Sequence, residues 1–538
     1  MRISILDEKS GAEFEIEARG EGKTLLTILQ ENGIYVDAPC SGRGTCGKCR
    51  IRLKEKSEEG ARAKEMALCA AERERLSGAE QRRGVRLACQ VIPERDCCIV
   101  ISDSGMADMA VLAGGSAQTG EKDSAVGAAE KGERSGVVAR SYGIAIDIGT
   151  TTLAASLLDL ASGEECAAAA AVNHQRAYGA DVISRIQSAG DGKAEQMRMC
   201  ICSDLKDLMA QLVGQAGISK CLVEKVVISA NTTMCHLLRG LSCEGLGIAP
   251  YTPVDLGLWE GTCSELLSGD AWDAKVTILP GISAFVGADI VSGIYACGLS
   301  EQSDTGFLLD IGTNGEMAVG NRDGFLVTSA AAGPVFEGGN ITCGVPGVPG
   351  AVTHLTIGGG YETIGGEPPI GLCGTGIIDA VSELVRNGYV DENGTLAEPW
   401  FESGVPVAGD TIYFAQQDVR EIQMGKSAIR AGIETLLSEY RKRDDCVSEA
   451  ALSVCLAGGF GYYMDVASAI RIGLFPKEFE GRVRSVGNSS LEGAKRFLCE
   501  EAHGAKECVE WIVNHAQEIG LAMHPEFNEL YLQHMFFE

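Results

Sequence analysis

Short stretches in which apolar and polar residues alternate predict strands at the start of the chain. Segments 2–6 and 13–17 both alternate with the period of two that a half-buried strand shows. Between residues 24 and 32 the apolar side chains recur at helical spacing instead, and Gly33 follows as a stop signal. Further strands are predicted at 49–53 and near 97–101, with a charged helix around 57–78. The pattern predicts a small α+β domain over residues 1–102.

Residues 103–141 lose this pattern. The segment is rich in Gly, Ala, Ser, Glu and Lys and poor in aromatic residues, which is typical of a flexible linker. Its one apolar patch runs from Met106 to Leu112. A flexible chain of this length has an r.m.s. end-to-end span of roughly 35 Å. Such a linker would let the first domain move between two docking positions.

From Tyr142 onward the sequence predicts alternating strands and helices, as in an α/β fold, and one strand-and-turn motif occurs twice. Gly143-Ile-Ala-Ile-Asp-Ile-Gly-Thr is a buried strand followed by a polar turn, and Phe307-Leu-Leu-Asp-Ile-Gly-Thr repeats it. The equivalent aspartates, Asp147 and Asp310, are 310 − 147 = 163 residues apart. Two such hairpins predict two similar α/β lobes that face each other, over residues 142–302 and 303–538.

The 538 residues carry a formal charge of −28, from 46 Lys and Arg against 74 Asp and Glu. This acidic excess argues against nucleic acid as a partner, because phosphates require a basic surface, and against an anionic membrane surface. The first residues lack the apolar core of a signal peptide, and no apolar run reaches the ~18 residues of a membrane helix. We therefore expect a cytoplasmic protein whose 21 cysteines are reduced thiols or metal ligands.

Four cysteines in the first domain have the spacing of an iron–sulfur site. Cys40, Cys46 and Cys49 share one Gly-rich loop, and Cys89 follows after 39 intervening residues. Three clustered thiolates and one distant thiolate can hold a 2Fe–2S cluster, and the loop glycines let backbone N–H groups approach its sulfides. Cys46-Gly-Lys-Cys49 alone also fits a redox-active dithiol or half of a zinc site. The other two cysteines favour the cluster, and with the strand order they predict a β-grasp ferredoxin domain.

Three further cysteines lie near these ligands in the sequence. Cys69 lies on the predicted charged helix and could be a spare thiol. Cys97 and Cys98 are neighbours on a predicted strand, so at most one of them can point toward the cluster. All three are interpreted as small buried apolar side chains.

The repeated Asp-Ile-Gly-Thr turn has the groups that a Mg²⁺-nucleotide needs. An aspartate at a strand end can organise Mg²⁺ and its waters, while the Gly and Thr beside it offer N–H groups and hydroxyls to phosphates. One Asp-x-Gly-Thr is often only a tight turn. Two copies, and a later strand that ends in Ala457-Gly-Gly-Phe-Gly461, favour nucleotide binding. The double hairpin resembles the acetate and sugar kinase, heat-shock chaperone and actin superfamily.

This resemblance implies roles for individual residues. Asp147 and Asp310 would organise Mg²⁺ and the attacking water, and segments 286–294 and 486–494 would form helices between the lobes. Gln423 and Lys426, on a helix predicted over 421–437, could face the ribose. The residues implied to contact phosphates and adenosine are Gly149, Thr150, Thr151, Gly312, Thr313, Asn314, Gly315, Gly458, Gly459 and Phe460.

The loop at residues 329–339 follows the second hairpin directly, so we expect it near the opening between the lobes. Three interpretations stay open for it. It lines the ATP site, it contacts a partner, or it is a plain tight turn.

Nearly the whole chain resembles the reductive activators of corrinoid proteins, in which a 2Fe–2S ferredoxin module, a linker and this split ATPase occur together. The matching stretches are 38–49, 147–151, 179–186, 332–338, 456–461 and the C-terminal 525–537. Some members of that family also carry C-terminal 4Fe–4S motifs. This chain has no Cys-x2-Cys-x2-Cys there, so we expect one cluster.

The resemblance implies a function. The protein would reactivate a corrinoid protein of a methyltransferase system by ATP-dependent reduction of Co(II) to Co(I). A cellular low-potential donor would supply the electron through the 2Fe–2S cluster, and hydrolysis of Mg²⁺-ATP would reset the complex. The resemblance also allows a homodimer, for which the sequence shows no interface.

Two other classes of function stay open from the residues alone. One is a small-molecule kinase with a regulatory ferredoxin module, although no acceptor-binding motif is evident. The other is a redox-gated binding protein that uses ATP only as a switch and turns over negligibly. An ATP-dependent reduction of cobalt distinguishes the activator from both.

Overall fold

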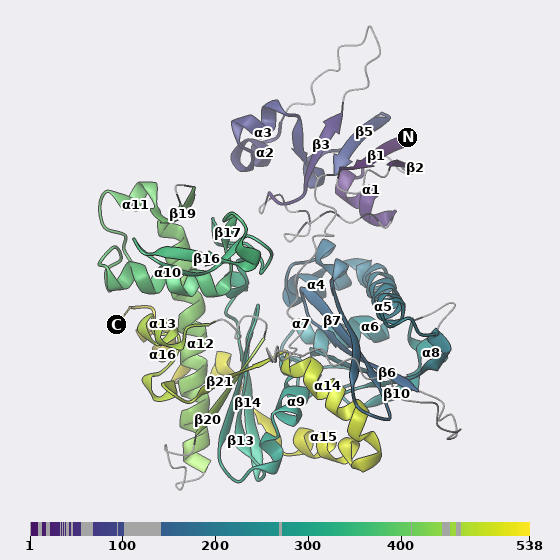
Figure 1. The fold of residues 1–538 in the computed structure, drawn as a ribbon. Helices are drawn as coiled ribbons and strands as arrows, with labels where there is room; N and C mark the ends of the chain where they lie inside the picture. Colours follow the sequence, from purple (N-terminus) through teal and green to yellow (C-terminus); the bar gives the residue numbers. More distant parts are fainter. Residues whose placement is uncertain are drawn as a thin grey trace, which may run out of the picture.

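The computed structural model describes residues 2–8, 13–17, 22–32, 34, 36, 38, 42, 44, 47–54, 68–93, 95–101, 141–267, 272–409, 411–443, 452–458 and 464–537. Figure 1 shows a small N-terminal domain above two larger lobes. The predicted linker at 103–141 lies outside the described residues except for Ser141, so its flexibility stays a prediction.

The N-terminal domain is built on a mixed five-stranded sheet. Its strands are β1 (Arg2–Asp7), β2 (Glu13–Glu17), β3 (Arg50–Lys54), β4 (Val85–Leu87) and β5 (Cys97–Ile101), in the spatial order β2-β1-β5-β3-β4. Strands β1 and β5 are parallel, and the other pairs are antiparallel. The apolar residues Leu25 and Leu29 of α1 (Leu25–Glu31) are wholly buried in the same core as Ile3 and Ile99. This confirms the predicted α+β, β-grasp fold.

The charged helix predicted around 57–78 differs in the structure. Residues 55–67 lie outside the described part, and the remainder forms α2 (Ala70–Arg75) and α3 (Gly78–Arg82). The break arises because Ser77 begins a new helix. Its hydroxyl accepts from the N–H of Glu80 at 3.3 Å, while the Glu80 carboxylate accepts from the Ser77 N–H at 2.8 Å.

A buried ion pair joins α2 to β4. Arg86 donates two hydrogen bonds to Glu72, at 2.8 and 2.9 Å, and Glu72 is wholly buried. Burial alone would raise the Glu72 pKa, but hydrogen bonds from Arg86 and from the N–H groups of Cys69 and Leu87 lower it. The carboxylate is therefore charged and fully partnered in the fold.

We expect Arg86→Met to destabilise this domain by roughly 3–5 kcal/mol, because it leaves the Glu72 charge buried without its cation. The measurement is the denaturant midpoint at which the domain unfolds within the full-length protein. Arg52→Met is the matched control on the same sheet. Arg52 pairs with Glu8 at 2.7 Å, but both side chains are about half exposed, so we expect a change of about 0–1 kcal/mol. Equal effects of the two variants would contradict the prediction.

The first lobe contains a six-stranded sheet in the order β10-β11-β9-β6-β7-β8. The strands are β6 (Tyr142–Ile148), β7 (Thr152–Asp159), β8 (Glu165–Val172), β9 (Val223–Ala230), β10 (Trp259–Thr262) and β11 (Lys275–Ile278). Its helices are α4 (Val182–Ser188), α5 (Ala194–Ala216), α6 (Thr232–Arg239), α7 (Glu244–Gly247) and α8 (Cys263–Leu267).

The second lobe repeats this plan in the order β21-β20-β12-β13-β14-β22. The strands are β12 (Gly306–Ile311), β13 (Gly315–Asn321), β14 (Gly324–Ala330), β20 (Ser453–Ala457), β21 (Val483–Gly487) and β22 (Ala516–Glu518). In each sheet the strand that carries the repeated aspartate pairs antiparallel with the next strand and parallel with a later one. The predicted internal repeat is confirmed.

The second lobe also has a smaller layer beyond its main sheet (Figure 1). It comprises β15 (Ala351–Thr356), β16 (Gly360–Thr363), β17 (Gly371–Leu372), β18 (Val405–Ala408), β19 (Ile412–Phe414), α10 (Gly374–Arg386) and α11 (Trp400–Ser403). The long α12 (Gln416–Arg443), α13 (Val466–Arg471) and α16 (Phe527–Gln533) complete the lobe.

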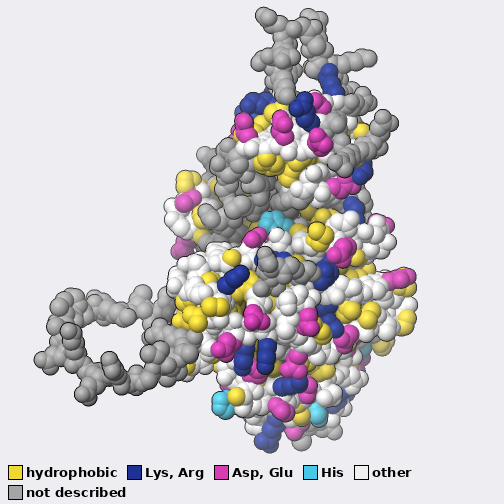
Figure 2. Space-filling view, turned by 90° about the vertical axis from the view of Figure 1, so that its right-hand side faces the viewer, with side chains coloured by type: hydrophobic (Ala, Val, Ile, Leu, Met, Phe, Trp, Pro, Cys, Tyr) yellow, Lys and Arg dark blue, Asp and Glu magenta, His cyan; other side chains and the backbone are white. Residues whose placement is uncertain are grey.

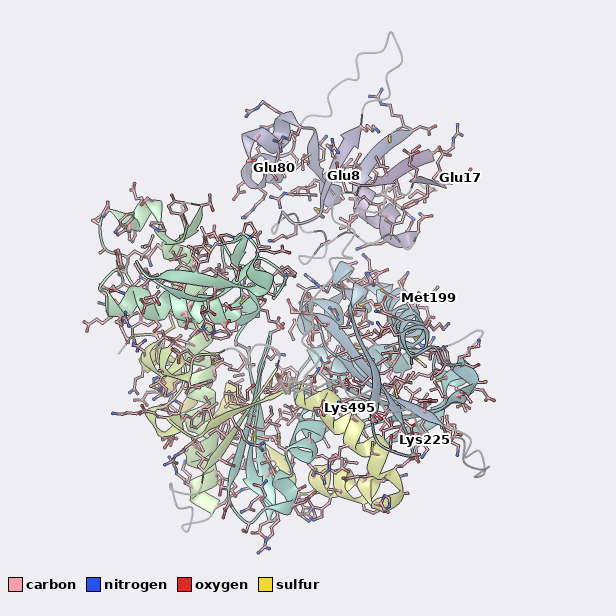
Figure 3. All side chains as sticks on the ribbon, viewed as in Figure 1. Glu8, Glu17, Glu80, Met199, Lys225 and Lys495 are labelled. Carbon is pink, nitrogen blue, oxygen red and sulfur yellow. The ribbon has the colours of Figure 1, made fainter. Side chains whose placement is uncertain are left out.

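Three helices connect the two sheets: α9 (Ala288–Ala296), α14 (Ser489–Glu500) and α15 (Ala505–Asn514). Although α14 comes late in the chain, it packs against β6 and β9 of the first lobe. Lys495 of α14 contacts Glu165, and Lys225 of β9 contacts Glu501; Figure 3 labels both lysines beside the yellow helices. The last strand of the first sheet ends at Ile278 and the first strand of the second begins at Gly306, while α14 returns to the first sheet. The division at 302/303 stays a prediction.

None of the helices within the described residues combines the length and apolar character of a membrane span. On the face shown in Figure 2, acidic and basic side chains are interspersed among the described residues. The acidic excess of the sequence is thus not gathered into one patch on this face.

Candidate functional site

Asp147 lies near the end of β6, in register with Ser229 of the parallel strand β9. Two side chains at the start of α14 hold its carboxylate. Asn488 donates to Oδ2 at 2.8 Å, and Ser490 donates to Oδ1 at 2.6 Å. Ser490 also bonds the Ser229 hydroxyl at 2.9 Å. A segment 341 residues away in the sequence therefore orients the first aspartate.

The turn after Asp147 is fixed from several sides. The Gly149 N–H bonds the Thr152 carbonyl at 3.0 Å, and a Cβ at Gly149 would lie 2.7 Å from that oxygen, so no larger residue fits. Asn231 donates to the Thr150 hydroxyl at 3.1 Å. The fully buried Arg185 donates to the Thr150 carbonyl. The following residue, Thr151, is half-buried on the same turn. The turn is thus held in one conformation.

Asp310 lies near the end of β12, in register with Ala457 of β20. Gly458 follows with a φ of +90°, and a Cβ there would lie 3.1 Å from Asp310 Oδ1. The strand predicted to receive adenosine therefore ends beside the second aspartate. Gly459 and Phe460 lie outside the described residues, so their contact with adenosine stays a prediction.

The side chains of the second turn bond carboxylates. Thr313 Oγ1 donates to Glu337 Oε2 at 2.7 Å, and the Asn314 amide bonds Glu316. The Gly312 N–H bonds the Asn314 carbonyl at 2.9 Å, which closes the turn. At Gly315 a Cβ would lie 2.0 Å from Ile429 Cδ1, so packing against α12 requires this glycine. The phosphate contacts predicted for these residues stay predictions.

Five half-buried acidic side chains converge where the two turns meet, and we name them the carboxylate cluster: Asp147, Asp289, Asp310, Glu316 and Glu337. Burial raises the pKa of Asp310 to about 7, with further contributions from Asp289, Asp147 and Glu337. Burial and mutual repulsion likewise raise the pKa values of Asp289 and Glu316. Burial also raises the Asp147 pKa, outweighing its two hydrogen bonds.

Such a cluster favours a bound cation, because a cation removes the repulsion among the carboxylates. The described residues nevertheless contain no group of three or more acidic, His or Cys side chains close enough to enclose a metal ion. Mg²⁺-ATP is usually coordinated partly by water and phosphate oxygens, and its binding at the carboxylate cluster stays a prediction.

The loop at 329–339 contributes directly to this region. Its η6 turn (Pro334–Glu337) brings Glu337 to Thr313, and Arg176 of the first lobe acts on the Glu337 charge. Burial raises the Glu337 pKa more than Thr313 and Arg176 lower it. Of the three interpretations left open by the sequence, these contacts favour a loop beside the ATP site.

The structure places Gln423 and Lys426 against the C-terminal segment. Gln423 is almost wholly buried and donates to the Met535 carbonyl at 2.6 Å. Lys426 is wholly buried and donates to the carbonyls of His534 and Phe536 at 2.6 and 2.7 Å. Both side chains therefore have a structural role in α12, and the ribose contact predicted for them stays a prediction.

We expect Lys426→Met to lower the free energy of unfolding by roughly 3 kcal/mol, because two carbonyls lose a charged donor. We expect its ATP affinity to stay unchanged. Thermal unfolding and calorimetric ATP titration measure the two quantities. Lys442→Met is the control on the same helix, since Lys442 is exposed and pairs only with exposed or partly exposed acids. Weaker ATP binding at unchanged stability would support the ribose contact instead.

The described part of the cysteine loop fits a cluster. Cys49 and Cys89 are both buried, and Gly42, Gly44 and Gly47 all have positive φ, as the predicted curled loop requires. A Cβ at Gly42 would lie 3.7 Å from Cys89 Cβ, so the loop closes over the distant cysteine. Cys40 and Cys46 lie outside the described residues, and their role as ligands stays a prediction.

Sequence reasoning did not single out Asp289, Glu316, Asn488 or Ser490. Asp289, Asn488 and Ser490 lie in the two segments that were predicted as helices between the lobes, and Glu316 follows the second turn by two residues. A polar residue at the first turn of each predicted interlobe helix was the available signal. Its importance depends on where the helix ends meet the two hairpins.

Comparison with known families divides the chain into three parts. Residues 7–94 match the 2Fe-2S iron-sulfur cluster binding domain. Residues 142–302 match the RACo middle region, and residues 304–538 match the C-terminal domain of RACo, the ASKHA domain. These matches identify a 2Fe–2S cluster site in the first domain and an ATP-binding fold in the lobes.

Individual relatives cover most of the chain. It is 34% identical over 433 residues to the corrinoid activation enzyme RamQ of Eubacterium limosum, covering 74% of this chain and 70% of the relative. It is 24% identical to a Co(II) methylated amine-specific corrinoid protein reductase of Methanosarcina barkeri, and the match covers 73% of this chain and 76% of the relative. A solved structure of a reductive activator for a corrinoid, iron-sulfur protein superposes with a TM-score of 0.67 at 26% identity. The superposition covers 100% of this chain and 98% of that chain.

Proposed function

The chain belongs to the family of corrinoid activation enzymes, and from this premise we propose that it returns a corrinoid protein of a methyltransferase system from Co(II) to Co(I) in an ATP-dependent reaction. Each event transfers one electron from a low-potential cellular donor to cobalt and hydrolyses ATP to ADP and phosphate. One observation carries the proposal. A single chain joins a domain with buried Cys49 and Cys89 to two repeated lobes, and the charge of Asp147 in one lobe raises the pKa of Asp310 in the other.

Hydrolysis is needed because the reduction is uphill for an ordinary ferredoxin. Each ~100 mV of mismatch costs about 2.3 kcal/mol per electron. Preferential binding of one state of the corrinoid protein offsets part of that cost, and nucleotide turnover releases the product state. The helices between the lobes link the two sheets. Helix α9 contacts β9 of the first sheet and β12 and β13 of the second, while α14 follows β21 of the second sheet and packs against β6 and β9 of the first. Asn488 and Ser490 at the start of α14 hold Asp147.

The two aspartates have different surroundings and, we propose, different roles. Asp147 is oriented by two hydrogen bonds, so it holds a fixed position beside Mg²⁺-ATP. Asp310 has a pKa raised to about 7, which suits a group that accepts a proton from the attacking water near neutral pH. The N–H groups and hydroxyls of the two turns approach the phosphates, and the end of β20 receives adenosine. Magnesium, when bound, neutralises phosphate charge.

In the first domain, the chain's own groups hold and shield the redox centre. We propose four cysteine ligands. Cys49 and Cys89 lie within the described residues, and Cys40 and Cys46 complete the set. The 2Fe–2S cluster, when bound, supplies one-electron chemistry. The buried core behind Cys89 excludes water from one side. We also propose a cytoplasmic location, as the sequence led us to expect, and a homodimer, which the family resemblance allows.

The test is an anaerobic mixture of the reduced protein and a Co(II) corrinoid protein, monitored by the absorbance of Co(I). We expect Co(I) to accumulate with Mg²⁺-ATP and to stay near the background level with Mg²⁺-ADP. A corrinoid protein already in the Co(I) state serves as the spectral control. A Co(I) signal that is equal with and without ATP, or absent across corrinoid partners, would defeat the proposal.

A further inference from the structure

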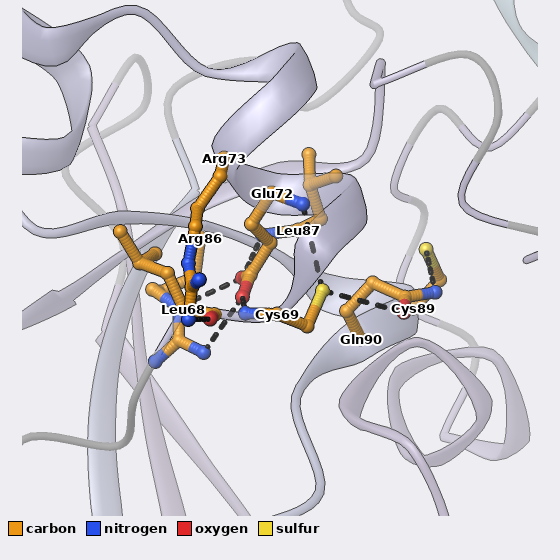
Figure 4. A network of polar contacts seen from close by, with 8 residues as sticks. All are labelled: Leu68, Cys69, Glu72, Arg73, Arg86, Leu87, Cys89 and Gln90. Carbon is orange, nitrogen blue, oxygen red and sulfur yellow. Dashed lines mark hydrogen bonds and ion pairs between the residues drawn. The ribbon is translucent and has the colours of Figure 1, made fainter.

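The sulfur of Cys89 accepts a hydrogen bond from the next side chain in the sequence. Gln90 Nε2 lies 3.4 Å from Cys89 Sγ and donates to it (Figure 4). This distance is normal for sulfur, which is larger than oxygen. A cysteine that ligates iron is a thiolate, which can only accept hydrogen bonds. The amide nitrogen, and not the amide oxygen, must therefore face Cys89.

The other end of the Gln90 amide has its own partner. Cys69 Sγ lies 3.6 Å from Gln90 Oε1 and donates to it. A thiol is a weak donor, but here it engages the oxygen and so leaves the NH₂ end directed at Cys89. The three side chains form a chain of contacts from Cys69 through Gln90 to the ligand sulfur, as Figure 4 shows.

The position of Cys69 is itself fixed. Its sulfur caps α2 by accepting from the Glu72 N–H at 3.4 Å, and the Glu72 carboxylate accepts from the Cys69 N–H at 2.9 Å. Arg86 holds Glu72 from the opposite side. Ser, Thr, Asp and Asn are the usual residues at such a cap. A thiol here meets the capping requirement and also reaches Gln90.

The cysteine loop covers the amide. A Cβ at Gly44 would lie 2.8 Å from Gln90 Nε2, so the loop backbone runs directly over the amide nitrogen. Gly44 also has a φ of +77°, which favours glycine. The half-buried Gln90 thus lies between Gly44 of the cysteine loop and Cys89.

We propose that Gln90 raises the reduction potential of the cluster by donating an N–H···S hydrogen bond to Cys89, and that Cys69 is the positioning residue that orients the amide. Reduction adds negative charge, part of which resides on the ligand sulfurs. A donor at Cys89 therefore stabilises the reduced state more than the oxidised state. The proposal rests on the cluster of the first domain, and it requires neither ATP nor a corrinoid partner.

The experiment is an anaerobic redox titration of the full-length protein, followed by the EPR signal of the reduced cluster. We expect Gln90→Leu to move the midpoint potential to a more negative value, and Gln90→Glu to move it further, because a carboxylate places negative charge beside Cys89. Gln81→Leu is the matched control. Gln81 donates to the Leu76 carbonyl at 2.7 Å and not to a cysteine, so we expect Gln81→Leu to keep the wild-type potential. Wild-type potentials in both Gln90 variants would overturn the proposal.

The Cys69 variants test the positioning role separately and cover the case in which Gln90→Leu does not retain its cluster. Cys69→Ala removes the donor to Gln90 Oε1, so we expect a smaller negative shift. Cys69→Ser keeps a donor and a helix cap, so we expect it to restore the wild-type potential. A merely structural role would lower the melting temperature of Cys69→Ala without moving its potential, and that result would overturn the positioning role. All of these potentials are measured without ATP or a corrinoid partner, so a failure of this proposal is distinguishable from a failure of the proposed cobalt reduction.

Discussion

Replacing Asp310 with asparagine is expected to lower ATP hydrolysis and ATP-dependent Co(II) reduction by about 10²-fold or more, because the side chain can no longer accept a proton or a cation. The same change should leave the nucleotide-free protein as stable as the wild type or more stable. Burial raises the Asp310 pKa to about 7, and Asp289, Asp147 and Glu337 add to the shift. Ionising Asp310 in the empty site is therefore unfavourable, and a neutral amide removes that cost.

Opposite signs in the two readouts make this prediction specific. Phosphate release and the rate of Co(I) formation measure the loss of activity. The melting temperature without nucleotide measures the stability. Asp323→Asn, in the exposed turn between β13 and β14, is the control and should change neither. If Asp310→Asn delivers electrons to cobalt as fast as the wild type, the coupling between hydrolysis and reduction is refuted.

Cys89→Ser is expected to abolish Co(I) formation and to remove the visible absorbance of the protein. A serine hydroxyl is rarely ionised near neutral pH, whereas the cluster needs a thiolate at this buried position. ATP binding should persist, because the lobes form their own cores apart from the first domain. Anaerobic absorption spectra, iron analysis and ATP titration together measure the outcome.

The control for this variant is Cys98→Ser. Cys98 lies on β5 opposite Ser4 of β1, on the sheet rather than on the cysteine loop. The sequence interpretation was a small buried apolar side chain, and the structure shows Cys98 half-buried. We expect Cys98→Ser to keep its colour and its iron. A Cys89→Ser protein with full iron content, or a Cys98→Ser protein without iron, would contradict the proposed ligand set.

Local patterns carried the prediction of the fold. The alternation at 2–6 and 13–17 correctly indicated β1 and β2, and the two Asp-Ile-Gly-Thr hairpins correctly indicated two sheets of the same plan. The prediction of one helix around 57–78 was wrong over the described residues, which form two helices. Ser77 and Glu80 form a capping box that starts the second one. That box is readable as Ser-x-x-Glu, but charged residues on both sides obscured it.

The candidate site was predicted in part. Asp147 and Asp310 each lie near the end of a strand that the hydrophobic pattern marks, and the charge of Asp147 raises the pKa of Asp310. Their roles at the nucleotide stay predictions. The expectation for Lys426 shows the limit of such reasoning. Its helix was predicted, but the direction of its side chain depends on a C-terminal segment more than 100 residues away, whose carbonyls bind it.

By itself the sequence determined that this protein has a 2Fe–2S ferredoxin domain and a repeated Asp-Ile-Gly-Thr hairpin, because spacing over a few residues specifies loops, strands and turns. Only the tertiary structure decided that Ser490 holds Asp147, that Glu337 joins the carboxylate cluster and that Cys69 reaches Gln90. These contacts join distant positions. Their geometry depends on how helices and sheets pack, and no local pattern of residues records that packing.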